Sequence, residues 1–273
     1  MKEQIVRAIE SVHASRPLIH SITNFVVMNI TANALLSAHA SPLMAHAVEE
    51  MDDLTDIDSA LVLNIGTLDP AWLESMELAG KLMRAKGKPV VLDPVGAGAS
   101  RLRTEASLRL LDMVRPQIVR GNASEIMALA SEIRRAERLP SSASSSTKGV
   151  DSLNDSREAV DSARFLAERF GCVVSISGER DFVTDGETVL VMEGGSPLMP
   201  LVTGMGCSAS AVTGAYAACA APLTAAAAAM SVFASAGEKA GKIAKGPGTF
   251  LPHFLDELYA VDSEDAARRV RKI

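Results

Sequence analysis

Nearly continuous apolar runs alternate along this chain with segments whose apolar positions recur every three to four residues. The apolar runs, which predict buried strands, lie at residues 60–65, 89–92, 117–120 and 172–177. The segments with helical spacing lie at residues 70–86, 104–114 and 156–170. Strands that are apolar on both faces and joined through helices are typical of a parallel sheet covered on both sides. The pattern therefore predicts an α/β fold with a mostly parallel central sheet and helices on both faces.

Shorter signals complete the predicted order of elements. Thr23 or Ser21 is placed to cap a helix that runs through Leu36. Apolar stretches on either side of Asp185 and Gly186 predict a β-hairpin. The remaining segments are predicted as an amphipathic helix at 1–15, a short strand at 41–45, an acidic helix at 49–58, a flexible surface loop at 140–150, a helix at 246–259 and a solvated helix from 263.

One long stretch, residues 194–237, carries no charged side chain. It consists mostly of Ala, Gly, Ser and Thr and contains prolines, whereas membrane spans are rich in Leu, Ile and Phe. We therefore expect two buried helices with small side chains, broken at Pro222. Helices of this kind can pack very close to a sheet or to another subunit.

The length and composition favour one domain that binds a small molecule. The chain has 273 residues, of which 48% are hydrophobic, and a formal net charge of −6. We expect a single domain over residues 1–273, and the negative charge speaks against nucleic acid or an anionic membrane as a partner. The three cysteines and five histidines lack the spacing of metal ligands, and no secretory leader precedes them, so we expect a cytoplasmic protein.

Two glycines and a thiol occur where a helix of small residues is predicted to begin. The turn contains Gly204, Gly206 and Cys207, and the first N–H groups of a helix lack partners and carry partial positive charge. Glycines let the backbone approach a ligand closely, and Cys207 is the one side chain of the turn that ionises. The turn is a candidate catalytic anion hole, although glycine-rich turns before helices also serve packing alone.

Charged residues follow two neighbouring predicted strands, at the sheet edge where ligands bind in open α/β folds. Asp93 opens a glycine-rich loop after one strand, and Arg120 and Glu125 follow the next. Arg120 can meet a phosphate, while Asp93 and Glu125 together can hold a hydrated Mg²⁺. Two structural interpretations stay open, because Asp before Pro is common in turns and Asn122 with Glu125 has the pattern of a capping box.

Two further residues have ordinary structural interpretations. Asn24 lies near a predicted helix start, where spacing alone favours a capping role. Met44 ends the short strand at 41–45, a position where methionine more often fills the core than contacts a ligand.

Seven short motifs occur in a fixed order between residues 20 and 248. They are HSITNFV at 20–26, ANALLSAHASPLMA at 32–45, LNIGTL at 63–68, DPVGAGAS at 93–100, RGNASEI at 120–126, KGVDS at 148–152 and TGMGCSAS at 203–210. Together they resemble the hydroxyethylthiazole kinase family. Ser21 stands where that family often has Cys, which indicates that this position does no obligatory chemistry.

The resemblance implies a ribokinase-like fold and a homotrimer whose thiazole pockets lie at subunit interfaces. It also implies the reaction, in which Mg²⁺-ATP phosphorylates the primary hydroxyl of 4-methyl-5-(2-hydroxyethyl)thiazole in thiamine biosynthesis or salvage. Family roles at matching positions put the thiazole near Asn24, Met44 and Gly204, and ATP near Arg120 and Ser177.

The same resemblance assigns the metal and the catalytic turn. Mg²⁺ is expected at Asp93 and Glu125, and Cys207 beside the reacting hydroxyl, in the anion hole formed with Gly204 and Gly206. Our hypothesis is that Cys207 is a modest proton acceptor rather than a covalent nucleophile, its pKa lowered by the helix start. Strong basicity is dispensable if the transition state is loose.

Three other functions fit these residues less well. A ribokinase-like kinase for another small alcohol, such as hydroxymethylpyrimidine, usually carries Asp in the turn, so Cys207 counts against it. A nicotinamide-dependent oxidoreductase is disfavoured because the turn around Gly66 lacks the G-x-G-x-x-G pattern. A catalytically silent binding protein would not need Asp93, Glu125 and Cys207 together.

Overall fold

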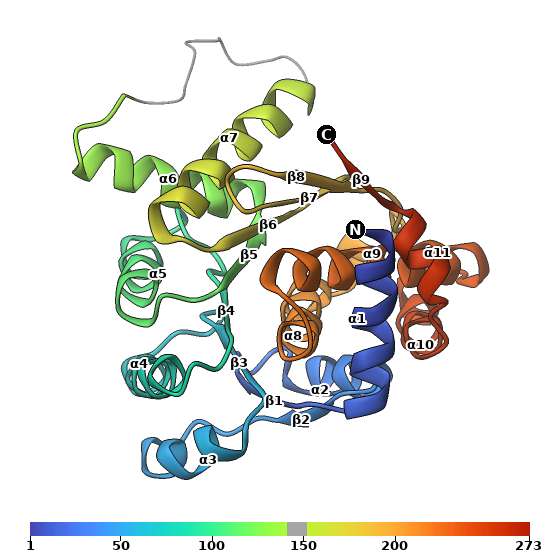
Figure 1. Ribbon diagram of the computed structural model, residues 1–273, viewed down its shortest axis with the longest axis horizontal. Helices are drawn as coiled ribbons and strands as arrows, with labels where there is room; N and C mark the ends of the chain where they lie inside the picture. The colour runs from blue at the N-terminus through green and yellow to red at the C-terminus, as the bar shows by residue number, and fades with distance from the viewer. Residues whose placement is uncertain (141–151) are drawn as a thin grey trace.

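A single nine-stranded sheet organises the computed structural model, which describes residues 1–140 and 152–273 (Figure 1). The strands are β1 (Leu18–Ile22), β2 (Ser41–Leu43), β3 (Ala60–Asn64), β4 (Val90–Asp93), β5 (Ile118–Asn122), β6 (Val173–Ser177), β7 (Asp181–Thr184), β8 (Val189–Met192) and β9 (Val270–Lys272). Their order is β2-β1-β3-β4-β5-β6-β7-β8-β9. The pairings from β2 to β6 are parallel, and those from β6 to β9 are antiparallel. Apart from Pro140, the predicted loop at 140–150 lies outside the described residues.

Helices cover both faces of the sheet, as Figure 1 shows. One face packs against α3 (Met51–Ile57), which follows a short 3₁₀ turn, and against α4 (Pro70–Ala85), α5 (Arg101–Val114), α6 (Ala123–Ala136) and α7 (Ser152–Phe170). The other face packs against α2 (Met28–Ser37), α8 (Met205–Ala217), α9 (Pro222–Ile243) and α11 (Ser263–Arg268), and α1 (Lys2–Ser15) and α10 (Pro247–Tyr259) pack against these helices. The predicted α/β class, with a mostly parallel sheet between two helical layers, is confirmed.

The two hydrophobic cores explain why the central strands are apolar without interruption. Successive side chains of a strand point to opposite faces of the sheet. In β3, Leu61 and Leu63 pack into the core under α4 and α5, while Ala60 and Val62 pack into the core under α8. A strand covered on both sides is therefore apolar at most of its positions.

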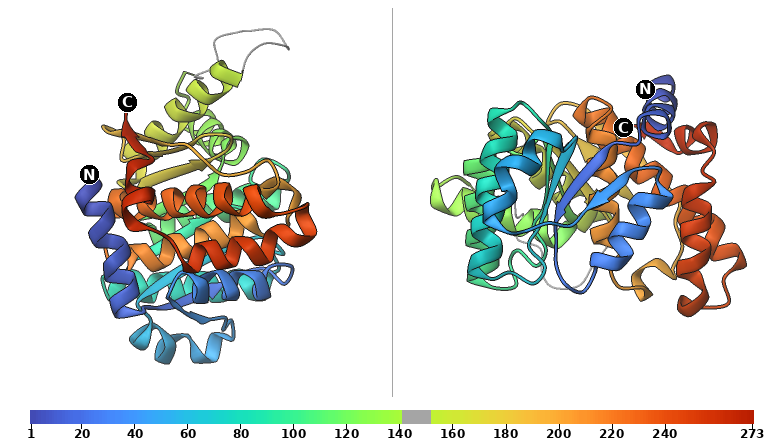
Figure 2. Two further views of the ribbon diagram at one scale, coloured as in Figure 1. Left: turned by 90° about the vertical axis from the view of Figure 1, so that its right-hand side faces the viewer. Right: turned by 90° about the horizontal axis from the view of Figure 1, so that it is seen from below.

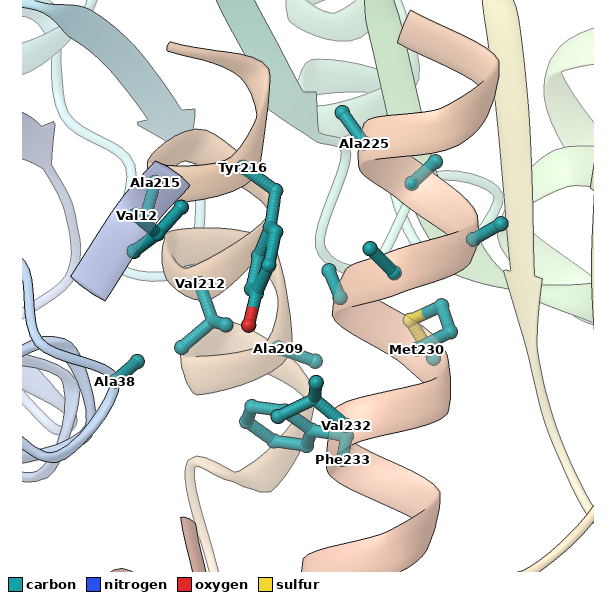
Figure 3. Close-up of a cluster of buried hydrophobic side chains, with 14 of the residues drawn as sticks. Val12, Ala38, Ala209, Val212, Ala215, Tyr216, Ala225, Met230, Val232 and Phe233 are labelled. Carbon is teal, nitrogen blue, oxygen red and sulfur yellow. The ribbon is translucent and has the colours of Figure 1, made fainter. Parts of the chain in front are cut away.

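The two helices with small side chains, α8 and α9, pack against each other and against the sheet. Figure 3 shows Tyr216 of α8 and Phe233 of α9 among alanine, valine and methionine side chains. A Cβ at Gly214 would lie 2.5 Å from Cγ2 of Val62, so α8 approaches β3 closely only because glycine occupies this position. Within the described residues, no helix combines the length and hydropathy that a membrane span requires.

The helix start predicted at Ser21 or Thr23 is wrong. Residues 18–22 form β1, and α2 begins at Met28 without a side-chain cap. The strand was missed because His20 and Ser21 interrupt its apolar pattern, although both are buried. His20 is accommodated there by a hydrogen bond of 2.7 Å to Asp58.

The solvated helix predicted from residue 263 is only partly correct. Helix α11 ends at Arg268, and the chain then adds β9 to the sheet, where Val270 pairs with Met192. Ala266 and Ala267 on α11 are buried, and α11 lies alongside α1 (Figure 2).

Candidate active site

Asp93 ends β4 at the carboxyl edge of the parallel strands and is almost fully buried. Its Oδ2 accepts hydrogen bonds of 2.7 Å from Nδ2 of Asn64 and 2.7 Å from Oγ of Ser210. Burial raises the pKa of Asp93 to about 6, with a smaller upward contribution from Glu125, even though Arg120 and the two hydrogen bonds favour the charged form. The structure thus holds a carboxylate whose charge is incompletely compensated by the protein.

Cys207 lies in the first turn of α8 and faces the same edge. Nδ2 of Asn24 donates to its Sγ across 3.7 Å. Burial, reinforced by the charge of Asp93, raises the pKa of Cys207 to about 11, against smaller opposing contributions from Asn64, Asn24 and Arg120. The expectation of a lowered pKa at this helix start is therefore wrong, because desolvation by burial raises it.

The glycines of the turn are needed for its geometry. Gly204 has φ of +84°, a left-handed conformation that favours glycine, and a Cβ there would lie 2.7 Å from Cγ2 of Ile30. A Cβ at Gly206 would lie 3.0 Å from Nη1 of Arg120. The turn therefore lies directly against α2 on one side and Arg120 on the other.

Asn24 follows β1 and does not cap a helix, which corrects the favoured sequence interpretation. Its Nδ2 donates to Oδ1 of Asn64 at 2.8 Å as well as to Cys207. Gly66 makes room for it, since a Cβ at Gly66 would lie 2.2 Å from Nδ2 of Asn24. Asn24, Asn64 and Asp93 thus form a chain of hydrogen bonds from the thiol to the carboxylate.

Arg120 and Glu125 lie on the next strand and helix. Nη1 of Arg120 donates to the carbonyl of Gly206 at 3.0 Å, while its buried Nε has no hydrogen-bond partner among the residues that the structure describes. Glu125 forms the capping box with Asn122, its Oε2 accepting from the backbone N–H of Asn122 at 2.8 Å. Its Oε1 accepts from the N–H of Gly96 at 2.8 Å. The structural interpretation of Glu125 is therefore correct, and its charge acts on Asp93 as well.

A cavity of about 910 Å³ opens beside the turn. Four of the predicted site residues line it, namely Arg120, Ser177, Gly204 and Gly206. Asp181 also lines it, and burial raises its pKa to about 6. The volume is in the range of small-molecule and cofactor sites.

The remaining predicted residue, Met44, lies apart from this cavity. It follows β2 (Ser41–Leu43) at the far edge of the sheet, half-buried against the core that α8 covers. Asn24 and Cys207 lie between the cavity and this edge of the sheet, because Cys207 adjoins Gly206 while Asn24 follows β1, the neighbour of β2.

The model of the hydroxyethylthiazole kinase family matches residues 9–264 of this chain. The chain belongs to that family. The hydroxyethylthiazole kinase of Nitratidesulfovibrio vulgaris (strain DSM 19637 / Miyazaki F) is 53% identical over 270 residues, which cover 98% of this chain and 97% of the relative. That of Brachyspira hyodysenteriae (strain ATCC 49526 / WA1) is 50% identical over 100% of this chain and 99% of the relative.

Solved structures agree with this family membership. The hydroxyethylthiazole kinase protein of Pyrococcus horikoshii OT3 superposes with a TM-score of 0.88 at 40% identity, over 100% of both chains. The pyridoxal kinase of Staphylococcus aureus in complex with AMP-PCP and pyridoxal has a TM-score of 0.57 at 17% identity, over 82% of this chain and 89% of that one. The similarity to the pyridoxal kinase concerns the fold alone. The ribokinase-like fold expected from the family resemblance is confirmed.

Asn64 and Ser210 are among the residues of this site that sequence reasoning missed. Asn64 carried a usable signal, because it ends a buried apolar strand as Asp93 does. Ser210 carried none, since only the packing of α8 across β4 brings its hydroxyl to Asp93.

Proposed function

We propose that this chain transfers the γ-phosphoryl group of ATP to the primary hydroxyl of 4-methyl-5-(2-hydroxyethyl)thiazole, a step of thiamine biosynthesis or salvage. The observation that carries the proposal is the continuous path from Asn24 and Cys207 to Asp93 beside a cavity lined by Arg120. It occurs in a chain of the hydroxyethylthiazole kinase family.

The cavity suits the nucleotide. Phosphoryl transfer requires mainly alignment and neutralisation of charge. Arg120 brings a fixed positive charge with an unpartnered Nε, and the turn at Gly204 and Gly206 brings the N–H groups of a helix start. Apolar side chains such as Met230 and Phe233 line another part of the cavity and fit a nucleobase.

The carboxylates fit a Mg²⁺ ion that arrives with ATP. Mg²⁺ keeps several waters and is usually held by one or two carboxylates together with substrate phosphates. We assign this role to Asp93 and Glu125: the charge of Asp93 is undercompensated, and its Oδ1 receives neither of the two hydrogen bonds made to Oδ2. Among the described residues there is no cluster of three acidic, Cys or His side chains that would bind the ion without substrate. When bound, the ion would neutralise charge on the phosphates.

The alcohol is proposed to bind between Asn24, Met44 and the turn at Gly204, with its hydroxyl at Cys207. A thiol with a pKa of about 11 is protonated at neutral pH, so Cys207 is not a preformed base. Its sulfur can accept a hydrogen bond from the hydroxyl and align the oxygen for attack. Because a loose transition state leaves the proton on the alcohol until late, this alignment is sufficient.

We further propose that the chain works in the cytoplasm as a homotrimer. The three cysteines are free thiols, as expected in a reducing compartment. Phe25 and Val26, which flank Asn24 in sequence, are 61% and 65% exposed, and a neighbouring subunit would cover them. Light scattering coupled to size-exclusion chromatography tests the trimer.

The deciding experiment is an ATP-dependent phosphorylation assay. ADP release and the phosphorylated product are measured with the thiazole alcohol, with hydroxymethylpyrimidine and with neither, each with and without Mg²⁺. We expect Mg²⁺-dependent turnover of the thiazole alcohol. Faster turnover of hydroxymethylpyrimidine would instead favour a ribokinase-like kinase for another alcohol, and no turnover above background in a folded chain that binds ATP would refute the proposal.

A further inference from the structure

Two consecutive carbonyls that follow β2 are hydrogen-bonded by buried side chains. Because a carbonyl only accepts, Nε2 of His20 carries a proton and donates to the carbonyl of Ala45 at 2.9 Å. Nδ1 of His20 shares a hydrogen bond of 2.7 Å with Oδ2 of Asp58. Oγ of Ser75 donates to the carbonyl of His46 at 2.5 Å. The backbone immediately after Met44 is thereby fixed to β1 and to α4.

Trp72, also on α4, connects this segment to the one that carries Asn24. Its Nε1 donates to the carbonyl of Thr23 at 2.8 Å. Its ring stacks on the ring of His46 at a centroid distance of 3.8 Å and contacts the ring of Phe25 at 4.7 Å. Residues on both sides of Asn24 are therefore held by the same side chain.

The sequence of α4 explains how one helix reaches both segments. Asp69 caps the helix, its Oδ1 accepting from the N–H groups of Ala71 and Trp72. Trp72 and Ser75 are three residues apart, so they share one face of the first turns. Both are buried, with 6% and 1% exposure.

We propose that Trp72, Ser75 and His20 are positioning residues for the alcohol substrate. The inference rests on the proposed function, in which Asn24 and Met44 contact the thiazole. Each of the three side chains acts on the backbone within two residues of a contact residue rather than on the substrate itself. Because both segments are already held in place in the free chain, less conformational entropy is lost when the alcohol binds. Their loss should weaken alcohol binding while leaving ATP binding and the phosphoryl step unchanged.

The sharpest test compares two serine variants. Ser75→Ala removes the bond to the carbonyl of His46 together with a bond to the carbonyl of Ala71, four residues earlier on α4. Ser107→Ala removes only the equivalent bond to the carbonyl of Arg103, from an equally buried serine on α5. We expect Ser75→Ala to raise KM for the thiazole alcohol about fivefold (~1 kcal/mol), with kcat and KM for ATP unchanged. Ser107→Ala should leave all three constants as in the wild type.

A second variant and a binding readout make the test independent of activity. Trp72→Phe keeps an aromatic ring and removes the donor to the carbonyl of Thr23. KM for the alcohol should therefore rise by a similar factor, and calorimetry measures Kd for the alcohol in this variant. Trp72 is the one tryptophan of the chain, so its fluorescence can be followed without interference from another tryptophan, while calorimetry measures Kd for the alcohol in the wild type and the serine variants. Kd of Ser75→Ala should rise in step with KM.

The outcomes separate this inference from the proposed function. If the wild type is active on the thiazole alcohol, equal values of KM and Kd for the alcohol in Ser75→Ala and Ser107→Ala would overturn the positioning role. If the wild type does not phosphorylate that alcohol, the proposed function fails, and acrylamide quenching of Trp72 without substrate still tests the holding role. Greater quenching in Ser75→Ala than in Ser107→Ala supports it, and equal quenching overturns it.

Discussion

Replacing Asp93 by Asn should stabilise the metal-free chain at pH 8, although the same change should abolish phosphoryl transfer. The carboxyl group is buried, and its Oδ2 accepts from Asn64 and Ser210. The carboxamide oxygen of Asn can accept both bonds, with its NH₂ group in the place of Oδ1. The variant therefore keeps the hydrogen bonds and removes only the buried charge.

The magnitude follows from the pKa of Asp93, which is raised from 3.8 to about 6. Because the folded chain holds this proton more tightly than the unfolded chain, the stability contributed by the protonated carboxyl is fully present below pH 3.8 and is lost as the pH rises through 6. A pKa raised by about two units lowers the free energy of unfolding by ~3 kcal/mol at pH 8. Asp93→Asn does not ionise and should escape this cost.

Urea unfolding in EDTA at pH 5 and pH 8 measures the effect, with wild type and Asp93→Asn compared at each pH. The variant should gain up to ~3 kcal/mol relative to wild type at pH 8 and about half of that at pH 5, where the wild-type carboxyl is still largely protonated in the folded chain. Asp181, whose pKa is also raised to about 6, is present in both chains and cancels. A difference that is the same at both pH values, or a variant less stable at pH 8, would refute the assignment of a buried, undercompensated charge.

Three further changes test the rest of the site. Cys207→Asp should remain active because a carboxylate can accept the hydroxyl proton, while Cys207→Ala should lose much of kcat; an inactive Asp variant or a trapped phosphocysteine would contradict this. Glu125→Ala should raise the Mg²⁺ concentration needed for the half-maximal rate and cost ~1 kcal/mol of stability through loss of the capping box; an unchanged metal titration would remove Glu125 from the site. Gly66→Ala should raise KM for the alcohol and lower the melting temperature, because its Cβ would lie 2.2 Å from Nδ2 of Asn24; unchanged values would show that Asn24 adapts.

Much of the fold was predictable because the central strands are buried on both faces and so leave an uninterrupted apolar signature. The strands that were missed lack it. β1 contains His20 and Ser21, whose polar atoms are accommodated by tertiary contacts that no local pattern reveals. β9 is a short strand with two exposed charged residues, and pairing with β8 decides its conformation.

The candidate site was predictable to the extent that it stands at strand ends. Asp93 and Arg120 were found in this way, and Cys207 was found from the glycine turn before α8. The protonation state of Cys207 was not predictable, because the sequence shows that the residue lies at a helix start but not that its thiol is buried, and burial raises the pKa. A helix dipole affects a pKa only modestly, whereas desolvation of a buried group shifts it by several units.

Asn64 shows how the two halves of the site become dependent on each other. The N–H of Gly66 donates to Oδ1 of Asn64 at 3.0 Å, and the carboxylate of Asp93 accepts from its Nδ2, so these two neighbours determine the orientation of the amide. Asn24 must then present Nδ2 to Oδ1 of Asn64, which turns the Asn24 carboxamide oxygen away from Asn64. The group that Asn24 leaves free on this side is therefore an acceptor. The position of Asp93 at the proposed metal side thus determines which polar group Asn24 can offer at the proposed alcohol side.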